Sequence, residues 1–219
     1  MDLLETLIKG RFMMIPLMAC SVVALAVILD RAAAFYANSR VDVRSLRSNL
    51  MRLLREHKIR EAATLCASTP SPVSAVLLAG LQSYMKLQKR TPENTRITVG
   101  QAMDDFLRQS IGTVEKRLWV LATIGTAAPL LGMTGTVTGM ITSFQSLAEA
   151  AGVDAGAVGI GISEALITTA TGLIIALAAV IPYSYFTSIS DATELDIEEA
   201  AKEMLDLLAT EVDAEKANG

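Results

Sequence analysis

Three long runs of the chain lack ionisable side chains, and they dominate its hydrophobic pattern. Residues 12–29 and 118–148 contain no Asp, Glu, Lys or Arg, and residues 158–186 contain a single acid, Glu164. A helix needs about 20 apolar residues, at ~1.5 Å each, to cross the ~30 Å hydrocarbon core of a bilayer. The pattern therefore predicts three transmembrane helices.

Between the first and second runs, the apolar residues recur at helical spacing, and no strand alternation is found. Near the start of this segment, four leucines follow helical spacing: Leu46, Leu50, Leu53 and Leu54. The run Ser68-Thr69-Pro70-Ser71-Pro72 ends a helical hairpin, and Thr91-Pro92-Glu93 is typical of a helix start. Because no proline lies between Asn94 and Pro129, we expect one long helix that continues into the membrane.

The end of the chain is acidic, whereas the middle is basic. Residues 187–219 hold 10 acids against 2 lysines, and residues 31–118 hold 15 Lys and Arg against 7 acids. The apolar residues of the tail have amphipathic helical spacing: Leu195, Leu205, Leu208 and Val212. We expect this helix to pack on the basic segment or on a neighbouring subunit, and the alternative is a frayed, solvated tail.

The basic flanks predict the topology, because segments rich in Lys and Arg stay in the cytoplasm. The first run is too long for the apolar region of a signal peptide, and the flank before it has no net positive charge, so we expect it to remain uncleaved. The predicted segments are an N-terminus outside the cytoplasm (1–11), transmembrane helix 1 (12–30), a cytoplasmic helical domain (31–117), transmembrane helix 2 (118–144), a loop outside the cytoplasm (145–157), transmembrane helix 3 (158–186) and an acidic amphipathic cytoplasmic tail (187–219).

Composition narrows the function classes. Apolar residues make up 52% of the chain and charged residues 19%, which excludes a disordered chain and argues against an ordinary soluble enzyme. Two cysteines and one histidine build neither a disulfide framework nor a zinc site. The glycine-rich segment 152–161 lacks the Lys-Ser/Thr of a phosphate loop. We expect no cofactor, no metal, no nucleic-acid partner and no enzymatic activity.

The second run carries a stripe of small residues. At ~100° per residue, Gly132, Gly135 and Gly139 fall on one helical face, together with Thr136 and Ser143. Hydrophobic burial drives helix pairing little in lipid, so small residues that let two backbones approach supply the attraction. We expect the three glycines to pack against another helix, and Thr136 either joins that packing or faces a wet lumen.

Glu164 is the exception in the third run. A carboxylate at membrane depth is costly unless it faces water, finds a cation or takes up a proton, and no basic residue lies in any of the three runs. Thr168 and Thr171 share its helical face, whereas Thr169 lies about 140° away. With water, such hydroxyls relay protons. The alternatives are a solvated Glu164 at the outer interface and threonines that bond to their own helix.

Two segments carry a resemblance to a known family. The run Ala128-Pro129-Leu130-Leu131-Gly132-Met133-Thr134-Gly135-Thr136-Val137 resembles the pattern of the MotA/TolQ/ExbB proton channel family. The run Gly161-Ile162-Ser163-Glu164-Ala165-Leu166-Ile167-Thr168-Thr169-Ala170-Thr171-Gly172-Leu173 resembles the matching segment of ExbB and TolQ. Three spans and a large loop after the first also match those two branches, whereas MotA-type stators have four spans and fit less well.

The resemblance implies an all-α, ring-forming polytopic protein of the bacterial inner membrane. It also implies that the outside is the periplasm, so that the N-terminus (1–11) and the loop (145–157) are periplasmic. Members of the ExbB type form pentamers around single-span helices of an ExbD- or TolR-like partner, and a TonB- or TolA-like protein carries energy to the outer membrane. The family pattern places the polar lumen residues at Glu164, Thr136 and Thr169, while the helical wheel favours Thr168 beside Glu164. The expected function is a proton-conducting motor subunit that couples the proton motive force to TonB-type transport.

Other functions stay open at this point. The same spans suit a TolQ-like subunit for envelope integrity and cell division. The small-residue stripe alone suits a scaffold that holds a partner helix without conducting. A solute transporter or metal-cation channel fits less well, because three spans are few for a carrier and no inverted repeat of broken helices is seen.

Overall fold

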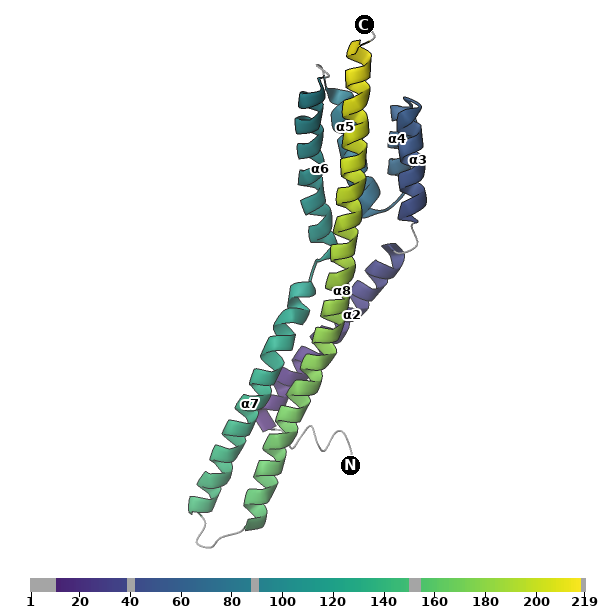
Figure 1. Cartoon of the computed structure of the whole chain (residues 1–219). Helices are drawn as coiled ribbons and strands as arrows, with labels where there is room; N and C mark the ends of the chain where they lie inside the picture. Colours follow the sequence, from purple (N-terminus) through teal and green to yellow (C-terminus); the bar gives the residue numbers. More distant parts are fainter. Residues whose placement is uncertain (1–10, 39–41, 88–90, 150–154, 218–219) are drawn as a thin grey trace. The chain divides into compact units, whose positions relative to one another are not determined.

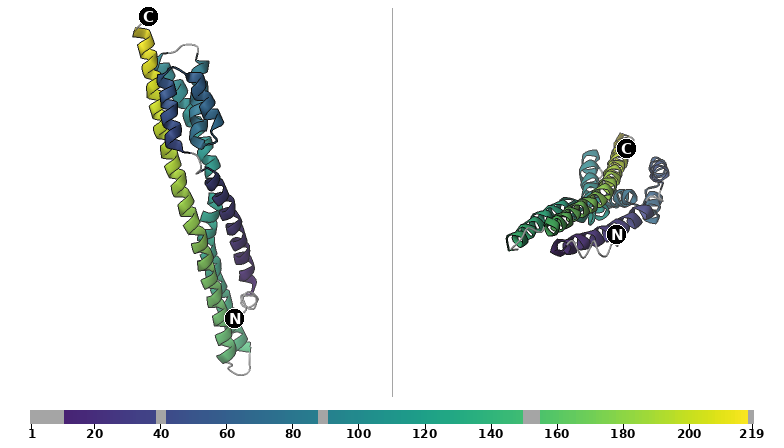
Figure 2. Two further views of the ribbon diagram at one scale, coloured as in Figure 1. Left: turned by 90° about the vertical axis from the view of Figure 1, so that its right-hand side faces the viewer. Right: turned by 90° about the horizontal axis from the view of Figure 1, so that it is seen from below.

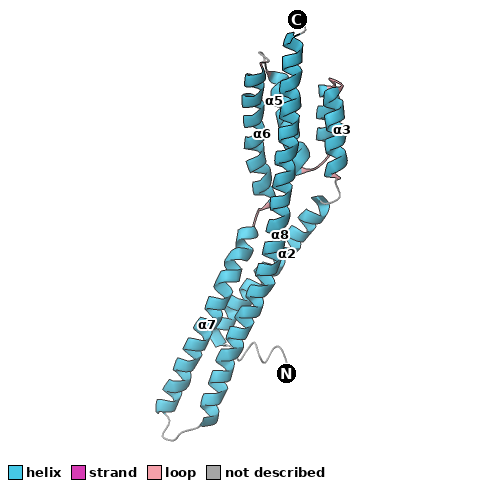
Figure 3. Ribbon diagram, in the orientation of Figure 1, coloured by secondary structure: helices cyan, strands magenta, loops and turns pink. Residues whose placement is uncertain are grey.

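The computed structural model describes residues 11–38, 42–87, 91–149 and 155–217. Within these ranges every regular element is an α-helix (Figure 3), so the expected all-α fold is confirmed. The chain divides into two compact units. The apolar unit comprises Met1–Arg31 and Arg117–Phe186, and the charged unit comprises Ala32–Lys116 and Thr187–Gly219.

The apolar unit is built from α2 (Arg11–Asn38), α7 (Leu118–Glu149) and the first part of α8 (Ala155–Ala217) (Figure 1). Among the described residues, three helices are long and apolar enough to cross a membrane, over Met13–Tyr36, Leu118–Gln145 and Val158–Thr210. The views agree that α7 and the first part of α8 run side by side with α2 along them (Figure 2). The three predicted apolar helices are therefore present, and the side of a membrane that each segment faces stays a prediction.

The charged unit contains four further helices and the last part of α8. They are α3 (Val43–Arg55), α4 (Ile59–Ser68), α5 (Pro72–Lys86) and α6 (Pro92–Val114). The Asp42 carboxylate accepts hydrogen bonds from two backbone amides at the start of α3. The Thr91 hydroxyl accepts one from the Asn94 amide at the start of α6. Side-chain oxygens that satisfy free N–H groups are the usual helix starts, so the predicted helix start at Thr91 is confirmed.

The core of the charged unit joins α3–α6 to the acidic tail. Leu46, Leu50 and Leu54 are buried as their spacing predicts. The buried face of α8 in this unit is Ile197, Ala200, Met204, Leu208 and Val212. Leu195 is 61% exposed in the single chain, because the face that packs on α3–α6 begins two residues later.

Ion pairs add to this packing, and they link the basic segment to the acidic tail. Arg47 of α3 contacts Glu199 at 3.0 Å and Glu203 at 2.6 Å, and Arg96 of α6 contacts Asp206 at 3.4 Å. The two carboxylates beside Arg47 raise the pKa of its guanidinium. In the part of the chain that the structure describes, the tail thus packs on the basic segment of its own chain.

The long helix expected from Asn94 into the membrane is not continuous. α6 ends at Val114 and α7 begins at Leu118. Arg117 has φ 69°, in the left-handed region, which breaks the helical path because its Cβ then crowds the following carbonyl. The Arg117 carbonyl accepts a hydrogen bond from the Val120 amide at 3.0 Å, so α7 starts anew from this residue.

Candidate functional site

Close contact between α7 and α8 forms the centre of the apolar unit. A Cβ atom placed on Gly132 would lie 3.0 Å from the Cα of Thr169, and one placed on Gly139 would lie 2.8 Å from the Cβ of Ala165. One on Gly172 would lie 2.5 Å from the carbonyl oxygen of Ala128. Real Cβ contacts are longer, so the two backbones approach to a distance that only glycine permits.

Gly135 and Thr168 interlock in this contact. The Thr168 methyl carbon lies 2.6 Å from the position of a Gly135 Cβ, and the Cβ of Met13 in α2 lies 3.5 Å from it. Thr168 is only 2% exposed, and its hydroxyl donates to the backbone carbonyl of Glu164 at 3.0 Å. Thr168 therefore fills the space that the missing Gly135 side chain leaves.

The other threonines make different hydrogen bonds. Thr169 donates its hydroxyl to the carbonyl of Gly132 on α7 at 2.8 Å, which joins the two helices. Thr136 donates to the Met133 carbonyl at 2.7 Å and Thr171 to the Ile167 carbonyl at 2.8 Å, both within their own helices. In each case the donor is occupied, while the hydroxyl oxygen keeps capacity to accept a hydrogen bond.

Glu164 lies one turn before Thr168 and is partly exposed. It is the one charged residue between positions 158 and 186, and among the described residues no group of His, Cys, Asp and Glu is arranged to hold a metal ion. Ionisable residues within apolar helices are rare and usually functional. Glu164 is therefore the candidate functional group of this site.

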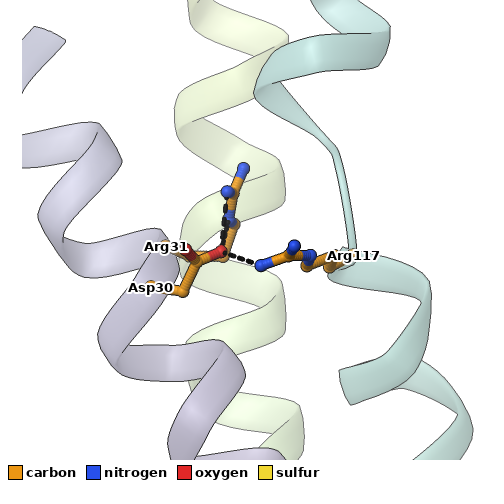
Figure 4. A network of polar contacts seen from close by, with 3 residues as sticks. All are labelled: Asp30, Arg31 and Arg117. Carbon is orange, nitrogen blue, oxygen red and sulfur yellow. Dashed lines mark hydrogen bonds and ion pairs between the residues drawn. The ribbon is translucent and has the colours of Figure 1, made fainter.

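The structure also brings together three charged residues that the sequence reasoning left unconnected (Figure 4). One oxygen of Asp30, near the end of the α2 span, accepts from Arg31 at 2.8 Å and from Arg117 at 3.0 Å. A signal was available, because the predicted topology puts the end of helix 1 and the start of helix 2 at the same membrane edge. An acid at one and a basic residue at the other are then close enough to pair.

The fold and site together define a polytopic helical membrane protein whose closely packed helices hold a lone carboxyl group. Residues 68–199 match the MotA/TolQ/ExbB proton channel family. The chain belongs to this family, which confirms the resemblance that the two glycine-containing segments carry.

Relatives of both branches are found. A putative biopolymer transport protein ExbB-like 1 from Synechocystis is 31% identical over 96% of this chain and 80% of its own length. A biopolymer transport protein ExbB from Pseudomonas putida is 28% identical over 78% of this chain and 52% of its own length. A Tol-Pal system protein TolQ from Pseudomonas aeruginosa is 35% identical over 57% of this chain and 56% of its own length. The chain spans about half the length of these two Pseudomonas relatives.

Proposed function

We propose that the protein is a proton-conducting subunit of the bacterial inner membrane, which couples the proton motive force to TonB-type transport across the outer membrane. The observation that carries the proposal is Glu164, a partly exposed acid within an apolar helix. No cationic residue occurs in 12–29, 118–148 or 158–186 to neutralise it. A group so placed gains most by exchanging a proton with water in an internal passage.

The proposed path runs through Glu164, Thr136 and Thr169. Thr136 and Thr169 are partly exposed, and their oxygens accept a hydrogen bond from water or from a protonated carboxyl group while their own protons are donated to carbonyls. Thr168 is buried against Gly135, so in the single chain it supports the helix contact. Its exposure to a pore stays a prediction.

The proposal includes the partners that the family resemblance implies. Copies of the chain form a ring, a pentamer in the ExbB-type arrangement, around the single helix of an ExbD- or TolR-like protein. A TonB- or TolA-like protein then receives the energy. The N-terminus is proposed to lie in the periplasm and the acidic tail in the cytoplasm. The relatives named ExbB and TolQ support this assembly.

Substitution of Glu164 tests the proposal. The chain is co-expressed with an ExbD-like partner in cells that lack their own copies of both proteins. Energy-dependent uptake of a siderophore or vitamin is then measured. We expect Glu164→Gln and Glu164→Ala to abolish uptake and Glu164→Asp to keep part of it, because only Asp retains a titratable group. Glu198→Gln, on the exposed face of the same helix, is the matched control. Wild-type uptake by Glu164→Gln would reject the proposal.

A second candidate is a TolQ-like role in envelope integrity, which the 35% identity to TolQ favours. The same Glu164 variants distinguish the two when detergent sensitivity and cell chaining are scored beside uptake. Loss of integrity with normal uptake would assign the chain to the TolQ branch. Two variants distinguish a conducting subunit from a non-conducting scaffold. Gly135→Leu should abolish the complex in either protein, whereas Glu164→Gln should leave uptake unchanged only in a scaffold.

A further inference from the structure

The ion pair between Asp30 and Arg117 occupies an unusual place in the backbone. Arg117 adopts φ 69°, a conformation that costs a non-glycine residue about 1–2 kcal/mol. Its guanidinium reaches the Asp30 carboxylate at 3.0 Å (Figure 4). The same carboxylate oxygen accepts from both Nε and Nη2 of Arg31. The first residue before α7 is therefore held to the end of the α2 span by its side chain.

A second contact joins α2 and α7 near their opposite ends. The Cβ of Met13 lies 3.5 Å from the position of a Gly135 Cβ. Met13 and Asp30 are 17 residues apart and Arg117 and Gly135 are 18 residues apart, so the two stretches measure about 26 and 27 Å. The helices are antiparallel and matched in length over most of the ~30 Å apolar core of a bilayer. The ion pair and the contact between Met13 and Gly135 therefore lie at opposite ends of the same pair of helices.

From Gly135 a chain of contacts leads to the candidate proton site. The Thr168 methyl fills the space beside Gly135, and the Thr168 hydroxyl is bonded to the Glu164 carbonyl. A shift of α7 along its axis by part of a turn would move Gly135 away from the Thr168 methyl, because the next glycines on this face, Gly132 and Gly139, lie about 4.5 and 6 Å away along the axis. Thr168 would then be displaced, and the turn of α8 that holds Glu164 would move with it.

We propose that Asp30 and Arg117 are positioning residues for proton exchange at Glu164. Their ion pair sets the depth of α7 against α2, and this depth places Gly135 against Thr168. The inference rests on the proposed proton-conducting function. It assigns a role to two charged residues at the edge of the apolar unit that contact neither Glu164 nor the threonines of the path.

The test compares uptake at equal amounts of membrane-inserted chain, measured by immunoblot of the membrane fraction, with the partner protein present. The variants are Asp30→Asn, Arg117→Gln, Arg117→Lys and the exchange Asp30→Arg/Arg117→Asp. The matched control is Arg96→Gln, which removes another Arg–Asp contact, the one with Asp206 in the charged unit. A displacement of the site by about 1 Å is enough for losses on the order of 10- to 100-fold.

We expect Asp30→Asn to lose on the order of tenfold, because it leaves two guanidinium groups without their shared carboxylate, and Arg117→Gln to lose less. Arg117→Lys should keep uptake within about twofold of the wild type, since it keeps the opposite-charge pair. The exchange should recover part of the loss of Asp30→Asn, because it restores the pair between positions 30 and 117 but puts a second guanidinium beside Arg31 in place of the carboxylate. Arg96→Gln should match the wild type. Unchanged uptake in both single variants would overturn the proposal, as would an inserted exchange variant no better than Asp30→Asn.

Two safeguards keep the result decisive. If the exchange variant fails to reach the membrane, the comparison of uptake by Arg117→Lys and by Arg117→Gln decides. Equal losses of uptake in these two variants would overturn the positioning role. Glu164→Gln is measured in the same cells. Wild-type uptake by that variant rejects the proton-conducting function itself, whereas loss in Glu164→Gln with normal uptake in the Asp30 and Arg117 variants rejects only the present inference.

Discussion

The apolar unit and the charged unit are both helical, but they differ in the residues at their closest helix contacts. Where α7 meets α8, glycine, alanine, serine and threonine make most of the closest contacts, and large apolar side chains such as Leu130, Leu173 and Leu177 are exposed. In the charged unit, large apolar residues such as Leu77, Leu81 and Leu208 are fully buried. Its basic and acidic residues lie outside.

The difference shows that two forces hold one chain together. Burial of apolar surface away from water stabilises the charged unit, by about 25 cal/mol per Å². In lipid this gain is small, and helices associate through close van der Waals contact and interhelical hydrogen bonds such as that from Thr169 to Gly132. Enlarging a small residue is therefore expected to cost most where α7 meets α8, and truncating a large residue to cost most in the core of the charged unit.

The largest expected effect comes from enlarging a small residue in the apolar unit. Gly132→Leu would place side-chain atoms where the backbone of Thr169 lies, at 3.0 Å and 3.3 Å from the first added carbon, and backbone cannot turn aside as a side chain can. We therefore expect much less of the Gly132→Leu chain to accumulate in membranes in a folded, protease-resistant form. Gly159→Leu on α8 is the control, because no atom lies within 4 Å of an added Cβ there. Equal accumulation of both variants would contradict the close approach of α7 and α8.

The next effect comes from truncating a large residue in the charged unit. Leu208 is fully buried and Leu195 is 61% exposed, on the same helix. Leu208→Ala should lower the free energy of unfolding by about 2–5 kcal/mol, because it removes buried methyl groups and leaves a cavity. Leu195→Ala should change it by less than about 0.5 kcal/mol. Denaturant unfolding of the full chain in detergent measures both, and similar losses would show that Leu195 is covered after all.

Much of the helical pattern could be predicted from local sequence. The leucines of α3 and the Thr91 cap of α6 depend on residues within one or two turns, so spacing and capping rules were enough. The break at Arg117 could not be predicted in this way, since neither Gly nor Pro marks it and its partner Asp30 is 87 positions away. The residues of the tail that its own chain covers could not be predicted for a related reason: which face of an acidic helix is covered depends on the helices it meets.

The candidate site shows the same limit. The helical wheel places Thr168 on the face of Glu164, and the Thr168 hydroxyl makes the bond to the backbone carbonyl of Glu164 that the alternative interpretation expected. The wheel contains no information on the opposite helix, and Gly135 of α7 is what makes Thr168 buried. The roles of Glu164, Thr136 and Thr169 in proton passage depend on neighbouring chains and water, so they stay predictions that only functional measurement tests.

A third test uses the buried thiol of the charged unit as a reporter. Burial raises the pKa of Cys66 to about 11 from 9.0. At pH 8 the thiolate fraction is then about 100-fold smaller than in the unfolded chain, so a maleimide should label folded Cys66 at least that much more slowly. Because the folded state holds this proton more tightly, the stability linked to Cys66 is complete below pH 9 and is lost as the pH rises through about 11.

The labelling is measured in a Cys20→Ser background, with the denatured chain as the reference for an accessible thiol. The rate should rise steeply with pH up to about 11 in the folded protein. Labelling as fast as in the denatured chain at pH 8 would show that the core around Cys66 opens readily. The contrast between a water-excluding charged unit and a lipid-facing apolar unit would then be weaker than the packing indicates.

The smallest effect is a stabilisation. The Thr95 hydroxyl is fully buried in the charged unit, and within the described part of the chain no hydrogen-bond partner lies near it. Thr95→Val keeps the shape and has similar helix propensity, so it should raise the free energy of unfolding by about 1 kcal/mol by removing an unsatisfied polar group. Thr98→Val, on the exposed face of the same helix, is the control. It should lower the free energy of unfolding slightly, since the Thr98 hydroxyl bonds to the Asn94 side chain at 3.3 Å. Destabilisation by Thr95→Val would mean that the hydroxyl is satisfied in solution, and that the core of the charged unit relies on polar contacts as the α7–α8 interface does.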